Sequence, residues 1–294
     1  MKQDINNNSS SAILITCHNR SQVTLNCLSA LYNQKPIFKV YLVDDGSRDG
    51  TSKDVEKQYP SVKIFPGDGN LFWVGGMHLA FAEAMKNDHE YYLWLNDDTI
   101  LESNALQTLI DTYSLVKNQG YLKSIIVGSV KDPDTGQYSY GGRIRSTKKF
   151  SRTFEAVEPT YEPQECDTMQ GNIVLIPRSV VEIVGNLEPA FTHQRGDLDY
   201  GLRAKKLGCS IFVAPGYLGT CPQNLVTGSW VDMSLSPYQR LKKVLQIKAF
   251  PPKEWAIFTK RHSGKLWFLY WTFPYIRALI GYKNLNYSPT FKQK

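Results

Sequence analysis

The sequence has few cysteines, and they follow no pattern that would give them a structural task. Five are scattered over 294 residues, at positions 17, 27, 166, 209 and 221, and no two form a CxxC pair. Zinc sites and disulfide frameworks both need closely spaced or evenly paired cysteines. The sequence therefore excludes both, and we expect a reducing compartment.

Long apolar runs are also missing. A membrane-spanning helix needs about 20 apolar residues, whereas the run Leu266 to Ile276 has 11 and is interrupted by Pro274. The segment Met1 to Ser11 is polar and rich in Asn and Ser, so we expect neither a secretory signal nor an anchor. We therefore expect a cytoplasmic protein that is peripheral on the inner face of the cell membrane.

Acidic residues are scarce in the C-terminal part of the chain. Arg240 to Lys294 has twelve Lys or Arg residues against one acid, Glu254, hence a charge of +11 in a chain whose net charge is +7. The same segment has twelve aromatic residues. Basic and aromatic residues together suit the lipid headgroup layer, so an anionic membrane is an expected partner. The alternative is that these aromatics pack on the main domain as ordinary core.

Through the first hundred residues, short apolar runs alternate with segments of helical periodicity. The runs end abruptly in polar residues, as buried parallel strands do. They are Ala12 to Thr16, Phe38 to Val43, Val62 to Phe65 and Tyr91 to Leu95, and the helical segments are Ser21 to Asn33, Thr51 to Tyr59 and Val74 to Met85. The alternation predicts an α/β fold with a doubly wound, mostly parallel sheet that binds ligands beyond the carboxyl ends of its strands.

Two further strands are expected in the second half, at Ile125 to Val130 and Asn172 to Ile176. Between them, Lys131 to Gln164 is rich in Gly, Lys and Arg and contains several prolines, so we expect loops and a hairpin. The composition changes at Pro237. We therefore divide the chain into a domain at 1–236 and a basic, aromatic and helical extension at 237–294.

A carboxylate pair, Asp97 and Asp98, directly follows the run Tyr91 to Leu95. At the end of a central strand, two carboxylates can hold Mg²⁺ or Mn²⁺ and, through it, two phosphate oxygens. The alternative is that the pair caps the next helix.

Asp44 and Asp45 end the second run, where a carboxylate can accept a hydrogen bond from a nucleobase. An Asx turn is the alternative.

The segment Gly67 to Gly76 is glycine-dense ahead of a helix, which lets backbone approach a ligand and presents helix N–H groups to phosphate. It is neither a GxGxxG fingerprint nor a Walker loop.

The segment Gly196 to Ala204 has the pattern of a helix start, with Asp197 and Asp199 near the positive end of the helix dipole. A helix cap with an Asp199–Arg203 pair is the structural interpretation, and such a pair contributes only about 0.3 to 0.5 kcal/mol. The functional interpretation is that Asp197 acts as a general base toward an acceptor hydroxyl.

In combination, these motifs resemble glycosyltransferase family 2. The segments that carry the resemblance are ILITCHNR, VYLVDDGSRDGT, GDGNLFWVGGMHLAFAEA, YYLWLNDDTIL, GNIVLIPRSVVEIVGNLEPAF and GDLDYGLRAKKLG, in the family's order. Within the family they are most similar to enzymes that build bacterial surface polysaccharides, often rhamnosyltransferases. The resemblance implies a nucleotide-diphospho-sugar transferase (GT-A type) fold, with a nucleotide-binding half at about 12–100 and an acceptor-binding half at about 101–236.

The resemblance also implies roles for particular residues. Asp97 and Asp98 fall where the family holds metal and ribose, and Asp197 falls where it has the base, with Asp199 as the second candidate. Together with the motifs, it leads us to predict a donor-binding set of Thr16, His18, Arg20, Asp44, Asp45, Asn70, Gly76 and Asp97. Gly196 stands where many members have Glu. Cys221 lies where many have a metal-ligating His, so this thiol or water would take that place.

The expected function is metal-dependent, inverting transfer of a sugar from a UDP, dTDP or GDP donor to a glycan or lipid-linked acceptor, without a nucleic-acid partner. Two alternatives remain open. A nucleotidyltransferase acting on sugar phosphates would share the sheet and the carboxylates, and a non-catalytic module would bind sugar or membrane only.

Overall fold

The structure, a computed structural model, describes residues 11–35, 38–147, 153–224 and 227–281. Four strands from the first hundred residues lie parallel, in the order β4-β1-β2-β3. They are β1 (Ser11–Cys17), β2 (Phe38–Asp44), β3 (Lys63–Pro66) and β4 (Tyr91–Leu95). Each of these strands begins and ends within one residue of the bounds expected from the sequence.

Beyond β4, the sheet continues through β12 (Ile173–Pro177), β6 (Ser124–Lys131), β13 (Ser210–Thr220) and β10 (Gln164–Glu165). Strand β12 is antiparallel to both of its neighbours, whereas β13 is parallel to β6. The short strands β5 (Ile100–Leu101) and β7 (Tyr138–Tyr140) pair with β13 and β6. The sheet is therefore mixed but mostly parallel, and the reversal at β12 was not anticipated, because an apolar run carries no direction.

The segment expected to hold loops and a hairpin contains β7 and the hairpin of β8 (Gly142–Arg145) and β9 (Phe154–Ala156). Strand β8 also pairs with β11 (Thr168–Met169), so these strands form a small second sheet, in the order β11-β8-β9.

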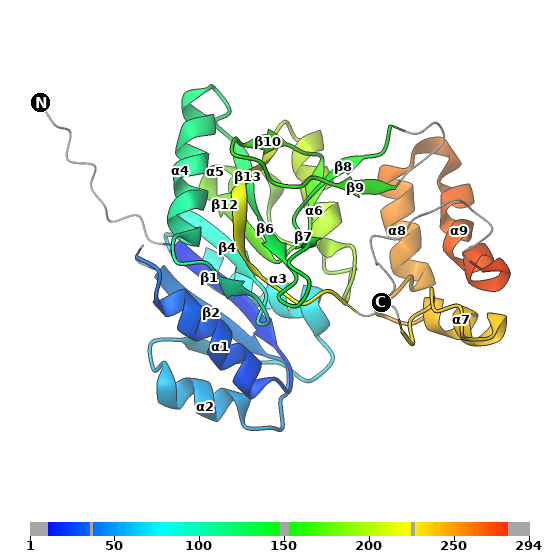
Figure 1. The fold of residues 1–294 in the computed structure, drawn as a ribbon, viewed down its shortest axis with the longest axis horizontal. Coiled ribbons are helices and arrows are strands. Elements are labelled where there is room, and N and C mark those ends of the chain that lie inside the picture. Colours follow the sequence, from blue (N-terminus) through cyan, green and yellow to red (C-terminus); the bar gives the residue numbers. More distant parts are fainter. Residues whose placement is uncertain (1–10, 36–37, 148–152, 225–226, 282–294) are drawn as a thin grey trace, which may run out of the picture.

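Helices cover both faces of the large sheet (Figure 1). Side chains of α1 (Ser21–Tyr32), α2 (Thr51–Gln58) and α4 (Ala105–Asn118) share one buried cluster, and those of α3 (Phe72–Met85), α5 (Arg178–Val184) and α6 (Gly196–Lys206) share the other. Successive residues of β1 alternate between the two clusters: Ile13 belongs to the first and Leu14 to the second. This alternation is the period of two that a strand requires.

The C-terminal part consists of α7 (Pro237–Val244), α8 (Pro252–His262), a 3₁₀ turn (Gly264–Leu266) and α9 (Trp267–Ile280). Figure 1 shows α8 beside α6 and α9 outside α8, on the side of the molecule away from α1 and α2. Phe258 of α8 is 5% exposed and belongs to the core cluster of α3, α5 and α6. Among the described residues, no helix has the length and apolarity that crossing a bilayer requires.

Candidate active site

Asp97 and Asp98 follow β4 at the middle of the sheet and already bind one cationic group. Arg20, in the loop after β1, donates from Nη1 to Asp97 Oδ1 at 3.0 Å and to Asp98 Oδ2 at 2.9 Å. Burial raises the pKa of Asp97 to about 6, although the charge of Arg20 opposes that rise. A buried carboxylate next to a second, partly exposed one is an environment that favours a cation.

The surroundings of this pair fit a divalent cation that is shared with a phosphate ligand. Asp97 Oδ2 is buried and has no hydrogen-bond partner among the described residues. Cys221 Sγ donates to Asp98 Oδ1 at 3.4 Å, and burial raises the pKa of this thiol. In the described part of the chain, no group of three or more His, Cys, Asp and Glu could hold a metal. Two carboxylates, water and diphosphate are the ligands that Mg²⁺ commonly takes.

Asp45 holds the glycine-rich segment in place with its side chain. Its Oδ1 accepts hydrogen bonds from the backbone N–H groups of Gly69 at 2.8 Å and Leu71 at 3.2 Å, and its Oδ2 accepts one from Phe72 at 2.9 Å. A carboxylate oxygen has two lone pairs, so Oδ2 can still accept one nucleobase N–H group.

Asp44 and Gly76, two further predicted donor-binding residues, are engaged in packing. Asp44 accepts hydrogen bonds from the Ser47 N–H group at 2.9 Å and from the Ser52 hydroxyl, so it closes the turn after β2. This arrangement corresponds to the Asx turn that was the alternative to nucleobase binding. A Cβ atom at Gly76 would lie 2.1 Å from Thr16 Oγ1. This glycine therefore lets α3 contact β1, and Thr16 is the residue that it contacts.

His18 and Asn70 are exposed, in the loops that follow β1 and β3. His18 Nδ1 lies 2.5 Å from the backbone oxygen of Asp45, so the loop after β1 is attached to the end of β2. Both side chains can reach a ligand at this edge of the sheet.

Asp197, in the first turn of α6, is hydrogen-bonded by backbone alone. Its Oδ1 accepts from the Leu198 N–H group at 2.7 Å and its Oδ2 from the Gly171 N–H group at 3.2 Å. Within the described residues its carboxylate takes part in no ion pair. Burial raises its pKa, although the two backbone hydrogen bonds oppose that rise. Burial therefore makes Asp197 a stronger base than an ordinary aspartate.

Trp73 contacts one residue beside Asp197 and one residue beside the carboxylate pair. Its Nε1 donates at 2.7 Å to Oδ1 of Asn96, the residue directly before Asp97. A Cβ atom at Gly171, whose N–H group binds Asp197, would lie 2.4 Å from the Trp73 ring. The sequence did not lead us to Trp73 or Gly171; the available signal was a tryptophan inside a glycine-dense segment.

Asp199, the second candidate base, faces the protein interior. It is 0% exposed and accepts hydrogen bonds from Arg203 Nε at 2.8 Å, Arg261 Nη1 at 2.9 Å and His262 Nε2 at 2.8 Å. Burial raises its pKa, but these hydrogen bonds and the charges of Arg203 and Arg261 outweigh burial and lower it. Asp199 thus links α6 to α8 and cannot meet an acceptor hydroxyl.

Strained backbone conformations occur next to the candidate site residues in the sequence. In the described part of the chain, the non-glycine residues with positive φ are Asn19 (52°), Phe72 (52°) and Arg195 (74°). They lie after β1, at the start of α3 and just before α6. Such conformations cost about 1 to 3 kcal/mol each and cluster at functional sites, so they agree with a binding site here.

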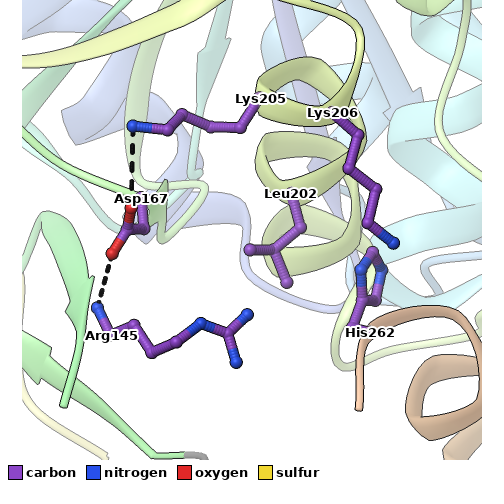
Figure 2. Close-up of a pocket in the computed structure, with 6 residues that line it drawn as sticks. All are labelled: Arg145, Asp167, Leu202, Lys205, Lys206 and His262. Carbon is purple, nitrogen blue, oxygen red and sulfur yellow. Dashed lines mark hydrogen bonds and ion pairs between the residues drawn. The ribbon is translucent and has the colours of Figure 1, made fainter. Parts of the chain in front are cut away.

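A separate pocket lies between α6, β8 and α8 (Figure 2). It is lined by Arg145, Asp167, Leu202, Lys205, Lys206 and His262. Figure 2 shows Asp167 engaged by Lys205 and by the backbone of Arg145. None of the predicted site residues lines this pocket, so it is distinct from the site at the strand ends.

Comparisons with known proteins agree with this arrangement. The model of a family described as Glycosyl transferase family 2 matches residues 12–182. Two curated relatives, the N-acetylglucosaminyl-diphospho-decaprenol L-rhamnosyltransferases of two Mycobacterium tuberculosis strains, are 24% identical over 210 residues, or 63% of this chain. The match spans 66% of each relative, just under two thirds of its length.

Solved structures show the same fold at low identity. A mannosyltransferase, PcManGT from Pyrobaculum calidifontis in complex with GDP-Man and Mn²⁺, has a TM-score of 0.56 at 13% identity, over 92% of this chain and 72% of its own. GalNAc-T7 with UDP, GalNAc and Mn²⁺ has a TM-score of 0.59 at 13% identity, over 87% and 51%. S. aureus TarS 1-349 in complex with UDP has a TM-score of 0.54 at 12% identity, over 91% of this chain and 73% of its own.

Proposed function

Because this chain belongs to glycosyltransferase family 2, we propose that it moves a sugar from a nucleotide-diphosphate donor to a hydroxyl of a glycan or lipid-linked acceptor, with inversion at the anomeric carbon. One observation carries the proposal. Asp197, a carboxylate outside any described ion pair, and the cation-binding pair Asp97 and Asp98 are linked through Trp73, which contacts Gly171 beside the first and Asn96 beside the second. Inverting transfer needs one base near the acceptor and a positive charge near the departing diphosphate.

The donor is a UDP, dTDP or GDP sugar in this proposal. UDP and GDP-Man are named with solved structures of the same fold. The free lone pair of Asp45 Oδ2 would accept a nucleobase N–H group, and the exposed His18 and Asn70 would flank the nucleotide. Arg20, which bonds both carboxylates here, would turn to the diphosphate once a metal ion binds them.

We include Mg²⁺ or Mn²⁺ among the partners, held by Asp97 and Asp98. The orphaned Asp97 Oδ2 supports this assignment, as does the Mn²⁺ named with two structures of this fold. When bound, the ion would offset the charge that develops on the leaving diphosphate. Since Asp97 and Asp98 are negatively charged like the diphosphate, donor binding should depend on that ion.

The chemical step is a single displacement in which Asp197 takes the acceptor's proton. The hydroxyl oxygen then attacks the anomeric carbon from the face opposite the diphosphate, so the configuration inverts. Hydrogen bonds from Leu198 and Gly171 orient the carboxylate without neutralising it.

For the sugar and acceptor, the curated relatives suggest a rhamnosyl or other hexosyl group and a lipid-diphosphate-linked glycan. We accordingly propose a role in bacterial cell-surface polysaccharide synthesis on the inner face of the membrane. The five described cysteines are free and buried, in keeping with a reducing compartment.

The test is incubation of the purified protein with a panel of UDP, dTDP and GDP sugars and Mn²⁺. Release of nucleoside diphosphate that needs an acceptor and stops in excess EDTA is the expected result. Release of pyrophosphate from a sugar phosphate and a nucleoside triphosphate would favour a nucleotidyltransferase instead. Binding of sugar with no turnover of any donor would favour a non-catalytic module.

A further inference from the structure

Helix α9 has an outward face made of apolar side chains. Six of them recur at helical spacing and are each 47% to 51% exposed: Phe268, Leu269, Phe273, Ile276, Leu279 and Ile280. Thr272 also lies on this face, and its hydroxyl is bonded within the helix, to the Leu269 carbonyl. A surface helix ordinarily has its polar side outward, whereas α9 has apolar side chains on its outward side.

Hydrogen bonds on the inner side fix this orientation. Trp271 Nε1 donates to the Pro252 carbonyl at 3.0 Å, and the Tyr275 hydroxyl donates to the Phe250 carbonyl at 3.0 Å. The buried Arg240 of α7 donates to two carbonyls in the last turn of α9, at 2.9 and 3.4 Å. Rotation of α9 would break these bonds, so only something outside this helical unit can cover the apolar face.

The helices around this face carry positive charge and almost no acid. Residues 255–281 contain no Asp or Glu. Glu254 is occupied on the inner side, where it accepts hydrogen bonds from Thr192. Six lysines of this part are exposed: Lys242, Lys243, Lys248, Lys253, Lys260 and Lys265. At the start of α9, Lys260 Nζ lies 4.8 Å from the centre of the Trp267 ring.

We propose that the outward face of α9 docks on an anionic phospholipid bilayer, with its apolar side chains among the acyl chains and the lysines at the headgroups. An apolar helix face with lysine and tryptophan at its edge has the composition of an interfacial helix. Anionic headgroups complement the lysines, whereas a second copy of this chain would bring its own lysines against them and be repelled. The inference concerns a surface and does not depend on the transfer reaction.

Docking on this face also orients the candidate active site. Helix α8 lies between α9 and the main domain, and its Arg261 and His262 bind Asp199 of α6 (Figure 1). Asp197 stands two residues before Asp199 on the same helix. A bilayer under α9 therefore holds the first turn of α6 in a fixed relation to the membrane, as an enzyme with a lipid-linked acceptor requires.

The test uses the full chain, because α8 contributes to the core and a truncated chain would lose part of it. Wild type, the variant F268S/F273S and the control L122S/Y161S are floated with phosphatidylglycerol or phosphatidylcholine vesicles. The control removes two exposed apolar side chains from the main domain, where Leu122 is 60% and Tyr161 is 98% exposed. Circular dichroism verifies that all three proteins are folded.

Wild type and control should float with phosphatidylglycerol vesicles, less with phosphatidylcholine, and less at high salt. F268S/F273S should bind about tenfold more weakly or worse. Equal flotation of F268S/F273S and wild type, or no flotation of wild type, would overturn the proposal. So would light scattering that shows a wild-type dimer and a monomeric F268S/F273S, because a second copy would then cover the face. Nucleoside diphosphate release, measured separately, keeps a failure of the transfer proposal distinct from a failure of this one.

Discussion

Asp197 and Asp199 lie two residues apart at the start of α6, yet only Asp199 is paired with cations. Arg203, Arg261 and His262 all contact Asp199, whereas Asp197 is bound by two backbone N–H groups. Two aspartates in the first turn of the same helix thus have pKa shifts in opposite directions. The pKa of Asp197 is raised by burial, and that of Asp199 is lowered by its hydrogen bonds and cations even though burial opposes this.

We expect Asp197→Asn to lose about 10² to 10⁴ in turnover, which is the usual contribution of general-base catalysis. Donor affinity should hardly change, because Asp197 accepts hydrogen bonds from the backbone of Leu198 and Gly171, whereas Arg20 binds Asp97 and Asp98. Steady-state kinetics and calorimetric titration with donor measure the two effects. NMR of the product should show an inverted anomeric centre; a retained configuration would contradict single displacement.

The rate should depend on pH through Asp197. As the proposed base, Asp197 would work only when ionised, and burial raises its pKa above the ordinary aspartate value. Activity should therefore be full at high pH and fall as pH drops through that raised pKa, at a higher pH than for an ordinary aspartate. A pH profile of kcat/KM for wild type and for Asp197→Asn checks this. The acidic limb should disappear in the variant, and a limb common to both would belong to another group.

Asp199→Asn should act mainly on stability. Removing one member of a buried ion-pair network costs about 3 to 5 kcal/mol, because the remaining charges are left without a partner. Because its folded pKa is lowered, Asp199 stabilises the fold at pH above the ordinary carboxyl pKa, and this contribution is lost as pH falls through the folded value. Denaturant melts at several pH values measure it, with the exposed Asp134→Asn as control. A stable but inactive Asp199→Asn would mean that Asp199 is the base.

Asp98→Ala should abolish turnover and remove the effect of Mn²⁺ on donor binding. Asp98 and Asp97 would hold the proposed ion together, so without Asp98 the diphosphate would lose much of its charge compensation. Titration of wild type and variant with nucleoside diphosphate, with and without Mn²⁺, gives the comparison. Full wild-type activity in excess EDTA would remove the metal from the mechanism.

Gly196→Ala should destabilise the contact between α6 and α3. A Cβ atom at this position would lie 2.7 and 2.9 Å from the two methyl carbons of Val74. Overpacking of this kind costs about 1 to 3 kcal/mol. Val74→Ala removes both methyl groups, so in the double variant the cost of Gly196→Ala should shrink. A double-mutant cycle of unfolding free energies measures the coupling, and strict additivity would contradict it.

The family, the fold and the edge of the sheet that bears the site could be predicted from the sequence. Parallel strands bring their carboxyl ends to one edge, so the polar residues after β1, β2 and β4 had to meet there. The structure brings together Arg20, Asp97 and Asp98 from two of these positions. Both the family and the GT-A type of fold expected from the motifs are confirmed.

Other features had no local signal. The bond between Arg261 and Asp199 joins residues 62 apart, and nothing near either of them indicates the partner. Glycine density predicted that the backbone of Gly67 to Gly76 approaches a ligand, and it gave no indication that Gly76 would contact Thr16. In the C-terminal part, Phe258 packs in the core whereas Phe268 is 48% exposed. Tertiary packing separates two phenylalanines that look alike in the sequence.

The single carboxylate of Asp45 gathers three backbone N–H groups from Gly69, Leu71 and Phe72. A shift of the Asp45 side chain would loosen all three of these amides together. This segment should therefore behave as a unit in hydrogen exchange, with the three amides exchanging at a common rate. A nucleotide that engages Asp45 would change that common rate, so these amides report donor binding even when no sugar is transferred.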